Sequence, residues 1–92
     1  MVNIDIEKRK ELSAFFATWD VMGFIKNGAS TDEYSLECSE FITRIIGLEK
    51  INEKIVSATL QSVFKELMEV DSRFLDKEYK RVSKEILAII NR

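Results

Sequence analysis

The chain contains no proline and only three glycines among its 92 residues. These two residue types are the strongest breakers of regular structure, so long helices can run here without interruption. No segment alternates apolar and polar residues over the length of a strand. The sequence therefore predicts an all-α protein.

Four segments repeat apolar residues at helical spacing. The length fits one domain, residues 1–92, because chains of about 100–200 residues usually form a single core. We therefore predict a compact bundle of four helices. The first predicted helix covers about 4–18, with Asn3 or Asp5 as its cap, and the second runs from the capping box Ser30–Glu33 to a glycine cap at Gly47. The third covers about 50–70, and the fourth covers about 74–90 after the cap Asp71–Ser72.

Residues 20–30, between the first two helices, carry two glycines but also several large apolar side chains. Val21, Met22, Phe24 and Ile25 would lose their favourable burial if this loop stayed in water. We therefore expect an ordered apolar loop that packs on the body of the domain.

The sequence shows no recognisable targeting signal. A single cysteine, Cys38, cannot form an internal disulfide, so cysteine usage does not indicate an oxidising compartment. No apolar signal-peptide core follows Met1, and the longest apolar run, Leu87–Ile90, is far shorter than the ~20 residues of a membrane span. We expect a cytoplasmic protein with no membrane partner.

Charge is distributed unevenly along the chain, although the net charge is only −2. Residues 20–53 carry seven acids against three bases, and residues 72–92 carry six bases against three acids. Nucleic-acid binding generally needs a basic face on a basic domain, so a nucleic-acid partner is not expected. The basic stripe of the last helix is interpreted as solvated surface, or as a complement to the acidic second helix within the fold or across a dimer; it consists of Lys77, Lys80, Arg81 and Lys84.

The residue types present offer little catalytic chemistry. No histidine occurs, which removes the commonest general base and most zinc and haem sites. Cys38 falls on an apolar helix face, where we expect a buried structural thiol. A metal cluster from Glu37, Glu40, Glu66 and Glu69 is conceivable, but the helical pattern places Glu37 and Glu40 on the outer face. We predict no enzyme, no metal and no cofactor.

An acidic stripe opens the second predicted helix and is the best candidate for binding a basic partner, because charge complementarity speeds encounter and favours specificity. A solvated helix face is the alternative. The candidate partner-binding residues are Asp32, Glu33, Tyr34, Glu37 and Glu40.

The segment Trp19–Gly23, followed by Tyr34 and Glu37, carries a family resemblance. It resembles short bacterial helical proteins catalogued as domain of unknown function 1871, whose pattern is Trp-Asp-Pro-hydrophobic-Gly and then Tyr-Asp-x-Glu. Val21 replaces the proline and Ser35 replaces the aspartate. The resemblance implies a small helical bundle and no assigned activity.

The residues of this turn favour a structural role over a ligand site. Trp19 offers a large anchor whose indole N–H needs an acceptor, which a loop carbonyl could supply. Asp20 can accept backbone N–H groups in an Asx turn, and Gly23 permits a positive φ.

The leading hypothesis is a non-enzymatic protein-binding module. Its most concrete form is a bacterial immunity or antitoxin-like inhibitor that covers a basic toxin with the acidic stripe. The alternative is a self-associating structural or accessory protein, such as a homodimer, and an enzyme ranks third.

Overall fold

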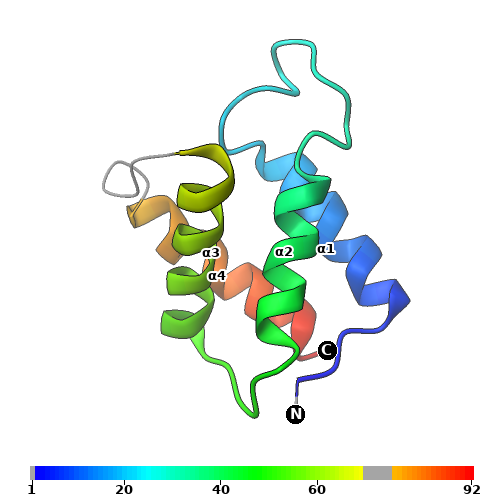
Figure 1. Ribbon diagram of the computed structural model, residues 1–92. Helices are drawn as coiled ribbons and strands as arrows, with labels where there is room; N and C mark the ends of the chain where they lie inside the picture. Colours follow the sequence, from blue (N-terminus) through cyan, green and yellow to red (C-terminus); the bar gives the residue numbers. More distant parts are fainter. Residues whose placement is uncertain (1, 70–75) are drawn as a thin grey trace.

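The chain folds as a bundle of four α-helices in the part that the computed structural model describes, residues 2–69 and 76–92 (Figure 1). No strand occurs in these two ranges, so the predicted all-α class is confirmed. Within them, no helix is long and apolar enough to cross a membrane. The helices are α1 (Ile6–Trp19), α2 (Ser35–Ile45), α3 (Glu53–Met68) and α4 (Asp76–Ile90).

Helix α3 organises the bundle. Its most extensive contact is with α4, and it also packs on α2, while α1 contacts both α2 and α4. In Figure 1, α2 and α3 lie side by side and α4 runs behind α3. Each helix turns most of its large apolar side chains inward, which removes them from water. The largest fully buried apolar side chains are Leu12, Phe16, Phe41, Ile45, Leu60, Phe64, Tyr79 and Ile86.

The first helix begins where a side-chain cap is available. The Asp5 carboxylate accepts a hydrogen bond from the Lys8 backbone N–H at 2.9 Å, so Asp5 and not Asn3 is the cap. Helix α3 likewise begins after Asn52, whose side chain accepts from the Ile55 N–H at 2.8 Å. The predicted start at residue 50 is therefore three residues early.

The predicted start and glycine cap of the second helix are wrong. Residues 31–34 form a turn, and α2 starts only at Ser35, with no side-chain cap from Tyr34. The backbone of Tyr34 lies outside the helical region because its side chain is held by groups in the preceding loop, described below. At the other end, Ile46 keeps a right-handed conformation and Gly47 does not take a positive φ.

The last predicted boundaries fall partly outside the described residues. Helix α3 ends at Met68, and Glu69 takes a left-handed conformation with φ 55°. Val70, the proposed cap Asp71–Ser72 and the first two residues of the predicted fourth helix, 74–75, lie outside the part of the chain that the structure describes. The described α4 starts at Asp76.

The loop before α2 is ordered and apolar, as predicted. Val21, Met22 and Ile25 are half-buried against the core. Phe24 is the exception, with 40% of its surface exposed. The loop rises above the ends of α1 and α2 and connects them (Figure 1).

Candidate functional site

Asp20 is the centre of the turn between α1 and α2. Its Oδ1 accepts a hydrogen bond from the Tyr34 hydroxyl at 2.5 Å and another from the Ile25 backbone N–H at 3.1 Å. Its Oδ2 accepts from the Lys26 N–H at 2.9 Å. The Tyr34 oxygen in turn accepts from the Met22 N–H at 3.1 Å. One carboxylate thus joins the end of α1, the loop and the residue before α2.

The protonation of this pair follows from its surroundings. Burial raises the pKa of Asp20, but the bonds from Tyr34, Lys26 and Ile25 together outweigh it and lower that pKa overall. Burial, and then the bond to Asp20, raise the pKa of Tyr34. The pair is therefore a carboxylate and a neutral phenol at neutral pH, and its bonds hold the turn together.

Trp19 connects the turn to α4. Its indole N–H donates to Oε1 of Glu78 at 2.9 Å, so the predicted loop-carbonyl acceptor is wrong. The ring meets Phe64 and Tyr79 edge-on, with centroids 5.7 and 6.0 Å apart. Arg81 lowers the pKa of Glu78, against an opposing effect of burial, and the Trp19 bond lowers it further. An ionised Glu78 thus accepts from both Trp19 and Arg81.

Gly23 takes the left-handed conformation that its residue type permits, with φ +71°. Its N–H donates to the Asp20 carbonyl at 2.8 Å, and its own carbonyl accepts from the Asn27 side chain at 2.7 Å. The turn closes on itself through these bonds.

The five residues of the predicted acidic stripe do not share one surface. Asp32 and Glu33 are exposed, whereas Tyr34 is buried. Glu37, expected on the outer face, is only 4% exposed, and its Oε1 has no hydrogen-bond partner among the described residues. Burial raises the pKa of Glu37, its own backbone N–H opposes this, and the charge of Glu33 raises it further. Glu37 is therefore not available to a partner.

The remaining stripe residue, Glu40, is half-buried because this side of α2 faces α3. Arg44 donates to Glu40 at 3.0 Å and to the Ser62 hydroxyl of α3 at 3.0 Å. It also forms an ion pair with Glu66 on α3. The contact between the two helices thus uses the part of the stripe that helical periodicity had assigned to solvent.

Two large apolar side chains that the sequence reasoning did not select are exposed in the same stretch of chain as the remaining acids, residues 24–36. Leu36 is 63% exposed on the outer side of α2, and the Phe24 ring stacks on Tyr34 with centroids 6.3 Å apart. Leu36 could have been found from the sequence, since it falls off the apolar stripe of its helix. We call Phe24, Asp32, Glu33 and Leu36 the Leu36 surface.

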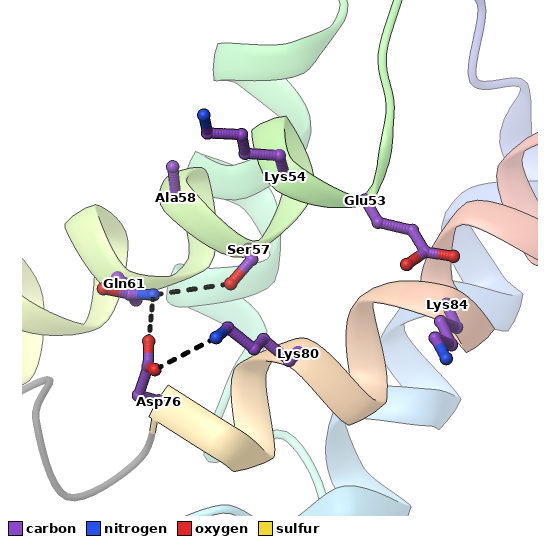
Figure 2. A pocket seen from close by; sticks show the side chains of 8 residues that line it. All are labelled: Glu53, Lys54, Ser57, Ala58, Gln61, Asp76, Lys80 and Lys84. Carbon is purple, nitrogen blue, oxygen red and sulfur yellow. Dashed lines mark hydrogen bonds and ion pairs between the residues drawn. The ribbon is translucent and has the colours of Figure 1, made fainter.

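A groove between α3 and α4 is a second candidate site (Figure 2). It is an open groove with a volume of about 630 Å³, within the roughly 300–1,000 Å³ of small-molecule pockets. Two members of the predicted basic stripe, Lys80 and Lys84, line it, whereas Arg81 points to Glu78 instead. The described lining residues are Glu53, Lys54, Ser57, Ala58, Gln61, Asp76, Lys80 and Lys84.

The other residues weighed for chemistry occupy structural positions. Cys38 is buried, and burial raises its pKa to about 11, so the thiol is protonated at neutral pH. Across residues 2–69 and 76–92, no group of three or more Cys, Asp or Glu side chains is placed to hold a metal ion. Of the four glutamates considered for a metal cluster, Glu37 is buried and Glu40 and Glu66 bind Arg44.

Comparison with known proteins adds no further observation on function. No family model, no curated protein and no solved structure matches the chain. The resemblance of the Trp19–Gly23 segment to a bacterial helical family stays a prediction. The Leu36 surface and the groove between α3 and α4 are therefore judged on their own geometry.

Proposed function

We propose that the protein is a non-enzymatic protein-binding module that docks a basic partner on its Leu36 surface. The exposure of Leu36 beside Asp32 and Glu33 carries this proposal. An exposed large apolar side chain that follows two exposed acids resembles part of an interface, where an apolar anchor supplies affinity and nearby charges select the partner. Asp32 and Glu33 form no ion pair with any described residue, so both charges remain available.

The support beneath the Leu36 surface is rigid. Phe24 stacks on Tyr34, and the Tyr34 hydroxyl donates to Asp20. Asp20 also holds two backbone N–H groups of the loop that carries Phe24. A pre-organised surface loses little conformational entropy on binding, which favours affinity from a small contact.

The most concrete form of this proposal is a cytoplasmic immunity or antitoxin-like inhibitor of a basic bacterial toxin. An inhibitor of this kind needs a stable acidic surface and no chemistry of its own. Membership in the helical family that the Trp19–Gly23 segment resembles belongs to the same proposal. Compared with the sequence-based hypothesis, the contact moves from the side of α2 to its beginning, because Glu37 is buried and Glu40 is paired with Arg44.

The test compares charge reversal on and off the surface. Asp32→Lys/Glu33→Lys removes the acidic rim, and Glu49→Lys/Glu85→Lys changes the net charge equally at two other exposed acids. Tagged parent and variant chains are used to capture proteins from the producing cells, and the captured protein is purified for measurement of its Kd with each chain. We expect a basic protein whose Kd rises at least tenfold with the first variant and less than twofold with the control.

Equal affinities of the two variants, or capture of no protein that binds the purified parent chain, would overturn the proposal. Sedimentation over a range of concentrations tests the self-association alternative on the same material. A stable dimer that forms without another partner favours that alternative.

A further inference from the structure

The groove between α3 and α4 combines an apolar wall with a small polar centre. Figure 2 shows Ser57, Gln61, Asp76 and Lys80 converging on this centre. The Gln61 amide nitrogen lies 3.4 Å from the Ser57 hydroxyl oxygen and 3.2 Å from Asp76 Oδ1. We propose that this groove binds a small organic anion, a carboxylate with an aliphatic body, independently of the Leu36 surface.

The polar centre has hydrogen-bond donors to spare for an anion. Ser57 is only 7% exposed, and its hydroxyl accepts from Gln61 while donating to no described residue. The Lys80 ammonium lies 3.5 Å from Asp76, a loose contact that leaves other N–H groups free. A ligand carboxylate at this point can accept from the Ser57 O–H and from Lys80, which satisfies a buried hydroxyl that otherwise lacks an acceptor.

The charge around the groove favours an anion over a cation. Three lysines line it against two acids, and Asp76 already receives bonds from Lys80 and Gln61. Lys84 also lines the groove and forms no ion pair with a described residue, so no paired carboxylate offsets its charge there. A ligand ammonium would have to compete with Lys80 for Asp76.

The walls and the size of the groove indicate the body of the ligand. Ala58 lines the groove together with lysines from both helices, whose methylene stems are apolar. The groove volume of about 630 Å³ suits a chain of several carbons better than an inorganic ion. An aliphatic carboxylate satisfies both the polar centre and the walls.

The test titrates the full chain with octanoate and follows backbone amide signals by NMR. Octylammonium serves as the matched cationic probe, and a short glutamate-rich peptide serves as a macromolecular probe. We expect saturable octanoate shifts at Ser57, Ala58 and Lys84, and much weaker shifts with either other probe. Lys80→Met/Lys84→Met is expected to raise the Kd for octanoate at least tenfold, and Ser57→Ala about threefold or more.

Lys65→Met/Lys77→Met is the control, because it removes two exposed lysines of the same helices that do not line the groove. We expect its Kd within twofold of the parent. The amide spectrum of each variant shows directly that it is folded. Equal binding of octylammonium, tighter binding of the acidic peptide, shifts outside the groove, or unchanged affinity in Lys80→Met/Lys84→Met would each overturn the proposal.

Discussion

Replacing Trp19 by alanine tests whether the end of α1 is a structural anchor. The ring touches Phe64 from α3 and Tyr79 from α4, and its N–H binds Glu78. One side chain of α1 thus holds the two helices that make the most extensive contact in the bundle. We expect Trp19→Ala to destabilise the whole fold and to weaken partner binding only as the folded fraction falls.

The expected loss is about 3 kcal/mol. Tryptophan-to-alanine changes in cores cost ~3–5 kcal/mol, and Trp19 falls at the lower end because it is not fully buried. About 1 kcal/mol of this belongs to the hydrogen bond to Glu78. A domain of 92 residues is expected to have a free energy of unfolding of about 5–14 kcal/mol, so the variant remains mostly folded in water.

The assay is urea unfolding followed by far-UV circular dichroism, since the variant lacks the tryptophan that fluorescence would report. Trp19→Phe keeps an aromatic ring and removes the N–H, so it should lose about 1–1.5 kcal/mol. Leu36→Ala, at a 63% exposed position, is the control and should stay within about 0.5 kcal/mol of the parent. The anchor role would be refuted if Trp19→Ala lowered the free energy of unfolding by less than 1 kcal/mol while the dependence of that free energy on urea concentration stayed unchanged.

Two further substitutions test the acids whose pKa values the fold shifts in opposite directions. The raised pKa of Glu37 means that its ionisation in the folded state costs stability as pH rises. Glu37→Gln should therefore be more stable than the parent by about 1 kcal/mol at neutral pH and equally stable below the pKa that Glu37 has in the unfolded state. Urea unfolding at pH 7 and pH 3.5 measures this difference, and a less stable variant at pH 7 would contradict the prediction. The lowered pKa of Asp20 means that its carboxylate stabilises the fold above the unfolded-state pKa and that this stabilisation is lost as pH falls. Asp20→Asn should therefore lower the thermal midpoint at neutral pH and make the midpoint decrease less steeply in acid. Parallel curves of thermal midpoint against pH for variant and parent, from pH 3 to 7, would contradict this.

Helical periodicity was enough to predict the class and the helix count because the apolar stripes alone identify faces that need burial. It could not determine where α2 begins. The capping box at Ser30–Glu33 predicts a helix start that does not form, because Tyr34 leaves helical geometry to reach Asp20. A contact that spans 14 residues outweighs the local preference here. The same limit applies to Trp19, whose acceptor Glu78 lies 59 positions further along the chain.

The candidate site was predicted less well than the fold, and Glu37 shows why. Periodicity places Glu37 about a quarter-turn or more from the apolar stripe of α2. A side chain at that position faces solvent only if a single neighbouring helix packs against the stripe. Helix α2 is covered by both α1 and α3, so its buried sector is wider than its apolar stripe. Arg44 then neutralises Glu40 and bridges to Glu66, a pairing that a one-dimensional pattern of charges does not reveal.

These pairings change what the uneven charge of the sequence means. Arg44 pairs with both Glu40 and Glu66, and Arg81 pairs with Glu78, which also accepts from Trp19, so part of the charge of the acidic front and of the basic tail is matched within the bundle. The charges that lie near exposed apolar surface or an open groove include Asp32 and Glu33 at one place and the groove lysines at another. Fields from exposed charges decay over ~8 Å at physiological salt, a small part of the 37 Å length of the molecule. Binding at the Leu36 surface and binding in the groove are therefore expected to depend on local charge pairs, with reversal of Asp32 and Glu33 leaving the Kd for octanoate unchanged.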